Sequence, residues 1–339
     1  MTTLEKALQN RILVLDGAMG TMLQRYHFTE ADFRGERFKD HRHPVQGNND
    51  LLSLTQPEAI ATIHANYFEA GADIVETNTF SGTTIAMADY GMEDLVYELN
   101  YESAKIAKEV AREFTRKTPE KPRFVAGAMG PTNKTASLSP DVNNPGFRAI
   151  SFEELRVAYK QQAAALLDGG VDVLLVETVF DTLNAKAALF AIEELKEERN
   201  QQVPVMLSGT ITDASGRTLS GQTAEAFLIS VSHVPLLSIG FNCALGAKQL
   251  TPHLEVLARH SNLAVSAYPN AGLPNAFGEY DETPTEMARQ IETYLDKNLI
   301  NIIGGCCGTT PEHIKAIATL VEKYSPRSFS LRTNTLKSV

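Results

Sequence analysis

The chain has 339 residues, of which 43% are hydrophobic and 21% are charged, values that are typical of a globular protein and exclude an intrinsically disordered chain. The formal net charge is -10 and no basic run is present, so we expect no nucleic-acid partner. No apolar stretch reaches the roughly 18 residues of a membrane span, and the polar N-terminus lacks the apolar core of a secretory signal. We therefore expect a cytoplasmic protein without a membrane partner.

Short, mostly hydrophobic runs alternate along the chain with longer segments of helical periodicity. This pattern predicts repeated βα units around a parallel sheet. The predicted strands cover residues 12–15, 73–76, 123–126, 171–176, 204–207, 237–239, 263–267 and 299–303. Eight such units favour an α/β fold closed into a (β/α)8 barrel, the TIM barrel, over an open eight-stranded sheet, which remains the alternative.

Capping boxes predict where several helices begin. In this motif a hydroxyl and a glutamate three residues later bond to free backbone amides of the first helical turn. The pattern starts at Thr55, Ser151 and Thr283. Thr310 precedes Pro311, and a proline at the first helical position marks a further helix start.

Two long segments interrupt the βα alternation, at residues 20–54 after the first strand and 130–150 after the third. Long connections without regular structure are usually functional or mobile. Both follow the carboxyl ends of strands, where barrel enzymes place their active sites. We predict one barrel domain over residues 1–324, and a linker or frayed tail over the polar residues 325–339.

The three cysteines of the chain, Cys243, Cys306 and Cys307, follow the sixth and eighth predicted strands. Their odd number and the adjacent pair argue against a disulfide framework. In a barrel one neighbour separates these two strands, so their carboxyl ends lie within roughly 10 Å and the three thiolates can meet on one ion. Sulfur ligands favour zinc over magnesium or calcium, and an open fourth position is typical of a catalytic site.

Two other interpretations of the cysteines stay open. Free cysteines are often small buried hydrophobic residues, although this explains less well why all three follow strands on one rim. The segment 304–308, Gly-Gly-Cys-Cys-Gly, could instead be a phosphate-binding loop after the eighth strand, an interpretation that leaves the cysteines without a role.

Carboxylates also follow predicted strands. Asp16 and Glu177, after the first and fourth strands, are candidates to bind a substrate ammonium group, and the backbone amides of Gly17–Thr21 are candidates to bind a carboxylate. A strand-end cap or an ion pair is the alternative for each carboxylate. Glu76 and Asp213 are weaker candidates of the same kind.

The segments Gly240-Phe-Asn-Cys243 and Gly304-Gly-Cys-Cys-Gly308, with the opening Leu15-Asp16-Gly17, resemble the signature of the homocysteine S-methyltransferase family. Within it the chain is most similar to the homocysteine-binding N-terminal module of cobalamin-dependent methionine synthase. The stretches that carry this similarity are ADFRGERF (31–38), GNNDLL (47–52), ETNTFSGTTIAMADY (76–90), GPTNKTASLSPDV (130–142), TITDASGRTLSGQT (210–223) and PNAGLPNAFGEYD (269–281). The resemblance covers residues 11–324 nearly throughout.

The resemblance implies roles for individual residues. Cys243, Cys306 and Cys307 would hold Zn²⁺ and form the catalytic centre. Asp16 and Glu177 would reach the amino end of homocysteine, and backbone near Gly17 and Ala18 would accept its carboxylate. Asn270 matches the family position whose side-chain oxygen can fill the fourth place on the metal when substrate is absent. Asn242 is a further substrate-binding candidate, and a hydrogen-bonding scaffold is the alternative for both asparagines.

The resemblance also implies a reaction, in which homocysteine is methylated to methionine. The implied donor is methylcobalamin, carried on a separate domain and remethylated from methyltetrahydrofolate on another. The expected partners are therefore L-homocysteine and the cobalamin-binding and folate-binding domains of a longer protein. Three alternatives remain: a small donor such as S-methylmethionine or betaine on the same barrel, a zinc hydrolase, and a non-catalytic zinc-stabilised barrel.

Overall fold

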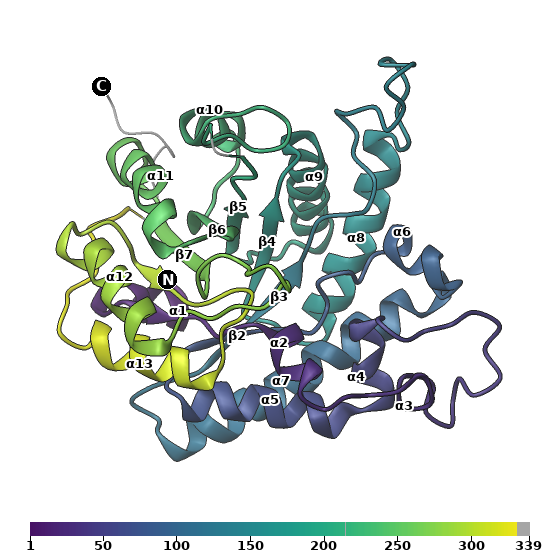
Figure 1. The fold of residues 1–339 in the computed structure, drawn as a ribbon, viewed down its shortest axis with the longest axis horizontal. Helices are drawn as coiled ribbons and strands as arrows, with labels where there is room; N and C mark the ends of the chain where they lie inside the picture. The colour runs from purple at the N-terminus through teal and green to yellow at the C-terminus, as the bar shows by residue number, and fades with distance from the viewer. Residues whose placement is uncertain (214, 331–339) are drawn as a thin grey trace.

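A computed structural model describes residues 1–213 and 215–330. Its eight strands are all parallel and form one sheet in the order β1-β8-β7-β6-β5-β4-β3-β2. A parallel bridge between Leu15 and Ile74 joins the first strand to the second and closes the sheet. The fold is therefore the predicted (β/α)8 barrel, with its helices around the outside (Figure 1).

Each predicted strand overlaps an observed one. The strands are β1 (Leu13–Val14), β2 (Ile74–Glu76), β3 (Phe124–Met129), β4 (Val173–Val179), β5 (Val205–Gly209), β6 (Ser238–Gly246), β7 (Ala264–Asn270) and β8 (Ile302–Ile303). The helices are α1 (Thr3–Asn10), α2 (Met19–Gln24), α3 (Glu30–Arg34), α4 (Leu52–Thr55), α5 (Pro57–Glu69), α6 (Thr84–Met87), α7 (Val96–Lys117), α8 (Phe152–Asp168), α9 (Thr182–Arg199), α10 (Ala224–Val231), α11 (Ala247–His260), α12 (Pro284–Asp296) and α13 (Pro311–Val321). Short 3-10 turns are η1 (Asn49–Leu51), η2 (Ala88–Tyr90) and η3 (Glu93–Leu95).

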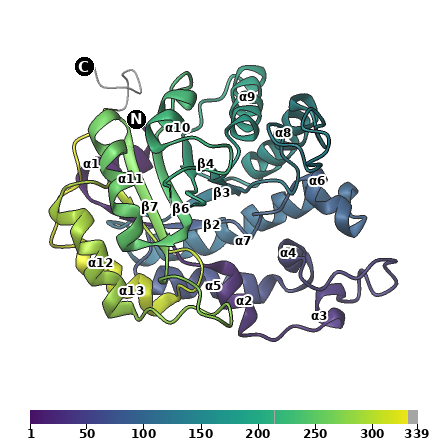
Figure 2. The same cartoon turned by 45° about the horizontal axis from the view of Figure 1, so that its top comes forward.

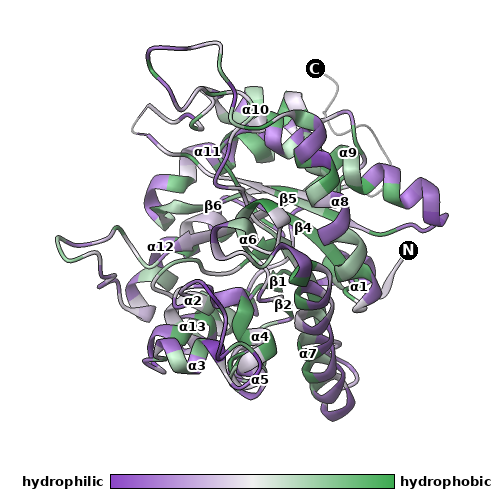
Figure 3. Cartoon of the chain, turned by 90° about the vertical axis from the view of Figure 1, so that its right-hand side faces the viewer, coloured by the Kyte–Doolittle hydropathy of each residue, from purple (hydrophilic) through white to green (hydrophobic). Residues whose placement is uncertain are grey.

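Residues of each strand alternate between two hydrophobic cores. Leu13 and Leu15 belong to the cluster inside the barrel, whereas Val14 belongs to the larger cluster between the strands and the helices. This alternation follows from the period of two in an extended chain. Leu4 and Leu8 of α1 join the inner cluster and close the N-terminal end of the barrel. Figure 3 shows the hydrophobic strands enclosed by helices whose outer faces are hydrophilic.

The predicted helix starts are mostly confirmed. Ser151 and Thr283 cap α8 and α12 with complete capping boxes, and Thr310 caps α13 with Pro311 at its first position. The box at Thr55 is wrong: Gln56 is the N-cap of α5, and the Thr55 hydroxyl donates to the carbonyl oxygen of Leu51. The physical reason is that Thr55 is itself the last residue of α4, so its hydroxyl bonds back into that helix.

The two long segments lie after β1 and β3, as predicted. Residues 20–54 contain most of α2 together with α3, η1 and α4, and this part of the chain extends from one side of the barrel (Figure 2). Residues 130–150 carry no helix or strand, although their first part is tied to α9, since the amide of Ala136 donates to Oδ1 of Asn184 over 2.9 Å. Within the described ranges no helix is long and apolar enough to cross a membrane.

The first residues of the segment predicted as a linker or frayed tail, 325–330, lie against the N-terminal end of the barrel. The guanidinium of Arg327 is buried and donates to the carbonyl oxygens of Ser261 and Leu263. Asn301, just before β8, donates to the carbonyl oxygen of Arg327 over 2.6 Å. The rest of that segment, residues 331–339, lies outside the described residues.

Replacement of Gly240 by alanine should destabilise the barrel severely. Gly240 of β6 pairs with Ser266 of β7, and a Cβ atom at Gly240 would lie 2.0 Å from the Ser266 carbonyl oxygen, which belongs to the backbone and cannot rotate away. We expect Gly240→Ala to lower the free energy of unfolding by about 3 kcal/mol or more. Urea denaturation measures this change. Gly146→Ala is the control, because its Cβ would meet only Asn144 Oδ1 at 4.0 Å; equal destabilisation by both substitutions would contradict the argument.

Candidate functional site

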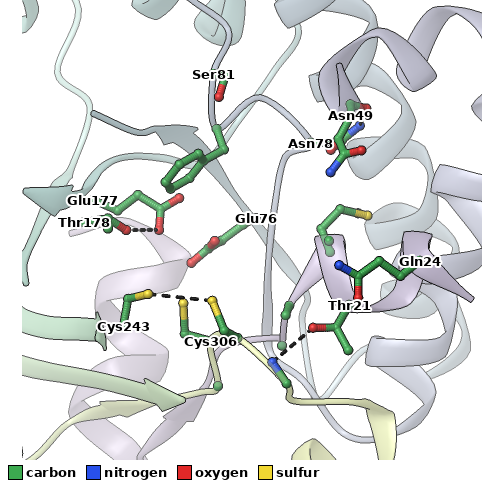
Figure 4. Close-up of a pocket in the computed structure, with 18 of the residues that line it drawn as sticks. Thr21, Gln24, Asn49, Glu76, Asn78, Ser81, Glu177, Thr178, Cys243 and Cys306 are labelled. Carbon is green, nitrogen blue, oxygen red and sulfur yellow. Dashed lines mark hydrogen bonds between the residues drawn. The ribbon is translucent and has the colours of Figure 1, made fainter. Parts of the chain in front are cut away.

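A cavity of about 1160 Å³ opens at the carboxyl ends of the strands. It is lined by residues that follow the strands and by parts of both long segments, including Gly47–Asp50 and Pro131–Asn133. Asp16, Glu76, Glu177 and all three cysteines contribute to its wall. Figure 4 shows Glu76, Glu177, Cys243 and Cys306 around the cavity. This is the face where barrel enzymes bind their substrates.

Irregular backbone at two strand ends brings the cysteines together. The register of β6 with β7 shifts between Asn242 and Gly246, and within this bulge Cys243 has a φ of 60°. Bulges of this kind re-aim side chains beside active sites. After β8, Gly308 has a φ of 79°, which lets the chain turn directly behind Cys306 and Cys307.

The three thiols have the geometry of a metal site. Their Sγ atoms all lie within 4.8 Å of one another, and those of Cys243 and Cys307 are 3.7 Å apart. Two sulfur ligands of a tetrahedral zinc ion, each about 2.3 Å from the metal, are about 3.8 Å apart, so the observed spacing fits this ion. The described part of the chain holds no other such group of potential metal ligands.

The thiols also influence one another's ionisation. Hydrogen bonds from Cys243 and then Cys306 lower the pKa of Cys307 to about 3, whereas the bonds of Cys306 to the other two sulfurs, together with burial, raise its own pKa. These shifts favour the ionised form of Cys307 and the neutral form of Cys306. A divalent cation would favour the ionised form of all three sulfurs, because it replaces shared protons as the positive partner.

Three carboxyl groups share the same cavity. Asp16 and Glu177 are each only 3% exposed, and Glu76 from β2 lies beside them. One carboxylate oxygen of Asp16 accepts a 3.0 Å hydrogen bond from the backbone amide of Glu76. Glu76 and Glu177 point into the barrel because they continue the inward positions of β2 and β4. The structure thus places Glu76, a weaker candidate from the sequence, beside the stronger candidates Asp16 and Glu177.

These carboxyls hold protons more tightly than ordinary acids. Burial raises the pKa of Glu76 to about 7. Burial first, and then the nearby charge of Glu76, raises the pKa of both Asp16 and Glu177 well above the usual range. Buried acids without a positive partner resist ionisation, and a cation in the cavity would reverse that preference.

The two asparagines are buried and absent from the cavity wall. Oδ1 of Asn242 accepts hydrogen bonds from the Thr178 amide and the Ser208 hydroxyl, so it ties β6 to β4 and β5. Oδ1 of Asn270 accepts a 3.1 Å bond from the Cys307 amide. Both side chains therefore support the backbone that carries the cysteines.

The other candidates divide between the cavity and the surface. Gly17 and Ala18 line the cavity, and the Ala18 amide donates a 3.1 Å hydrogen bond to the Thr309 hydroxyl. Asp213 is exposed and accepts hydrogen bonds from Ser215 and Arg217 within its own turn. Asp213 is therefore not brought to the cavity.

Tyr268 is a residue of the site for which sequence reasoning gave no role. It lines the cavity beside the carboxyls, is 2% exposed, and its hydroxyl has no hydrogen-bond partner among the described residues. Its place on an inward position of β7 was open to prediction, since Ala264 of the same strand lies in the inner cluster and Tyr268 is four residues later.

Comparison with known proteins agrees with this architecture. Residues 13–321 match the model of the homocysteine S-methyltransferase family. The homocysteine methyltransferase MmuM from Escherichia coli has a similar structure: its metallated form superposes with a TM-score of 0.71 and 24% identity, over 91% of this chain and 96% of that chain. The apo form of MmuM matches with a TM-score of 0.64 and 23% identity, over 91% and 96% of the two chains. Since the family model spans most of the sequence, this chain belongs to the homocysteine S-methyltransferase family.

Proposed function

We propose that the chain binds Zn²⁺ through Cys243, Cys306 and Cys307, activates the thiol of L-homocysteine there, and methylates it with methylcobalamin as the donor. The observation that carries this proposal is the cluster of three sulfur atoms within 4.8 Å, at the wall of a cavity that also holds buried carboxyls. Three sulfur ligands leave one tetrahedral position for the sulfur of the substrate.

A free thiol with a pKa near 8.5 is mostly protonated at neutral pH, while only the thiolate attacks a methyl group. Bound zinc would supply the positive charge that stabilises the homocysteine thiolate. Asp16 and Glu177 would bind the ammonium group and so orient the sulfur toward the cavity mouth, a positioning role. No side chain has to act as a general base, because the thiol proton leaves as the substrate binds.

Two observations support a large donor. The cavity, at about 1160 Å³, is larger than the roughly 300–1,000 Å³ of most small-molecule pockets, so homocysteine would leave much of it free. Both long segments that resemble methionine synthase line its mouth, at Gly47–Asp50 and Pro131–Asn133. The donor would be carried by a cobalamin-binding domain of a longer protein. A folate-binding domain would supply the methyl group that remethylates the cobalamin.

Metal analysis combined with proton release tests the proposal. We expect one zinc per chain. When homocysteine is added near pH 7, at least about one proton per chain should be released. Methyl transfer should then be measured with methylcobalamin, S-methylmethionine and betaine under the same conditions. Activity only with a small donor would overturn the cobalamin assignment, and full activity without zinc would overturn the mechanism.

The same sample separates the other classes of function. Hydrolytic activity that homocysteine inhibits as a competitor would indicate a zinc hydrolase whose open metal position holds water. Unfolding on chelation, without any affinity for homocysteine, would indicate a zinc-stabilised barrel that is not an enzyme.

A further inference from the structure

Asp16, Glu76 and Glu177 form an acidic group without a positive partner, in which Asp16 and Glu177 are buried and Glu76 is partly buried. None of the three forms an ion pair with a described residue. Arg25 and His313 are the basic residues that line the cavity within the described ranges. Arg25 is exposed, and the ring of His313 bonds to Thr310 and to the carbonyl oxygen of Glu282. If these acids ionise, the compensating positive charge would therefore have to come from a ligand.

Two buried polar atoms beside the carboxyls are also without partners. Oε1 of Glu76 and the hydroxyl of Tyr268 are both shielded from solvent, and neither has a partner at normal hydrogen-bond geometry among the described residues. Glu177 lies near enough to the Glu76 carboxyl, and Ser208 near enough to Tyr268, to influence their pKa values. Buried polar groups in folded proteins are nearly always hydrogen-bonded. Both residues line the cavity, and Figure 4 shows the Glu76 carboxyl pointing into it between Glu177 and the cysteines. A ligand with hydrogen-bond donors at this place would satisfy Glu76.

The spacing of the carboxyls argues against a shared metal ion. Among the described residues only the cysteines bring three potential ligand atoms within 4.8 Å of one another. The three acids are therefore too dispersed to share one metal ion, which needs its oxygen ligands at roughly 2.0–2.6 Å. An ammonium group bonds through three separate N–H donors to acceptors at roughly 2.7–2.9 Å, and it does not need all three carboxyls to surround it at once.

We propose that Glu76 is a third carboxylate that binds the α-ammonium group of the thiol substrate. Asp16, Glu76 and Glu177 together give up one shared proton to solvent as this cation enters. This inference rests on the proposed function, because it concerns the same substrate. In the free protein the proton resides on the acids. On binding, one neutral carboxyl becomes a carboxylate, its proton goes to the buffer, and the ammonium keeps all three of its own protons.

The surroundings of Glu76 support this exchange. The titratable groups that interact with it are Asp16 after β1, Glu177 on β4 and Tyr268 on β7, together with Tyr67 of α5. All of them are acidic or neutral. Burial, which raises the pKa of Glu76 to about 7, makes a shared proton expected in the empty cavity at neutral pH. The exchange would give the site a preference for amino-acid thiols over thiols without an amino group, beyond what the metal provides.

Calorimetry with two thiols tests this inference. L-Homocysteine and 4-mercaptobutanoate differ only in the amino group, and titration of the zinc-loaded protein in buffers of different ionisation enthalpy counts the protons released by each. The wild-type protein should bind homocysteine more tightly and release up to about one proton more with it. Glu76→Gln should weaken homocysteine binding roughly 10- to 100-fold, leave 4-mercaptobutanoate binding unchanged and remove most of the extra proton.

The matched control is Glu279→Gln, the same substitution at an exposed glutamate on the cavity rim, which should behave as wild type. Glu76→Asp, which keeps the charge on a shorter side chain, should recover part of the preference for homocysteine. If Glu76→Gln keeps both the preference and the extra proton, the inference is wrong while the proposed function stands. Equal weakening of both thiols together with zinc loss would assign Glu76 a structural role. Zinc-loaded wild type that binds no homocysteine would end both proposals.

Discussion

Cys306→Ala should remove the metal and lower methyl transfer by more than about 100-fold while the barrel stays folded. Loss of a residue that only orients a metal ligand typically costs 10- to 100-fold, so loss of a ligand itself should exceed this. Cys306 packs at the edge of the inner core, and removal of one sulfur atom there should cost about 1 kcal/mol of stability. Zinc content, circular dichroism and the methylation rate, measured on one preparation, check the three parts of this prediction.

A change of similar size away from the metal provides the control. Ser266→Ala alters a buried hydroxyl of β7 that has no hydrogen-bond partner in residues 1–213 and 215–330, so zinc content and activity should stay at wild-type values. Loss of the circular dichroism spectrum in Cys306→Ala would contradict the prediction, because it would make the cysteine a determinant of folding. A stoichiometric zinc content in this variant would contradict the ligand assignment.

Glu177→Gln should weaken homocysteine binding roughly 10- to 100-fold while zinc stays at one equivalent per chain, since a hydrogen bond to a charged group is worth about 1.5–3 kcal/mol. Glutamine keeps the size of the side chain and its contact with Thr178, so the buried site should remain packed. The substitution also removes an acid that burial and Glu76 keep from ionising, so the affinity of the variant should depend less on pH near neutrality.

Equilibrium titration at several pH values, followed by metal analysis of the same samples, measures both effects. Glu225→Gln, a change on the first turn of α10 outside the cavity, is a suitable control. Loss of zinc from Glu177→Gln would count against a substrate-binding role. Unchanged affinity for homocysteine would show that the remaining carboxyls bind its ammonium group without Glu177.

The order of elements could be predicted because it depends on local patterns. Hydrophobic runs located all eight strands, and hydroxyl–glutamate pairs located the starts of α8 and α12. The same pattern failed at Thr55, where two helices follow each other and the hydroxyl bonds backward to Leu51. A capping motif does not indicate on its own which helix its hydroxyl serves, since neighbouring carbonyl oxygens compete for it.

The membership of the site was predictable only in part. The barrel topology was enough to predict that Cys243 lies near Cys306 and Cys307, because it puts the ends of β6 and β8 one strand apart. The close contact of the sulfur atoms also needs the bulge in β6 and the turn at Gly308. Asp213 also follows a strand, yet it lies on an exposed turn. A residue that follows a strand thus lies at the carboxyl-terminal rim of the barrel. The course of its loop then decides whether the side chain points toward the cavity.

The sequence by itself determined the strands, the barrel and the family, because these depend on residue order, periodicity and motifs that persist along the chain. Only the tertiary structure decided that Glu76 and Tyr268 join Asp16 and Glu177 in one cavity, and that both asparagines support the cysteine loops. The physical reason is burial. Whether a carboxyl keeps its proton, or a hydroxyl lacks a partner, depends on groups from distant strands that meet only after the sheet has closed.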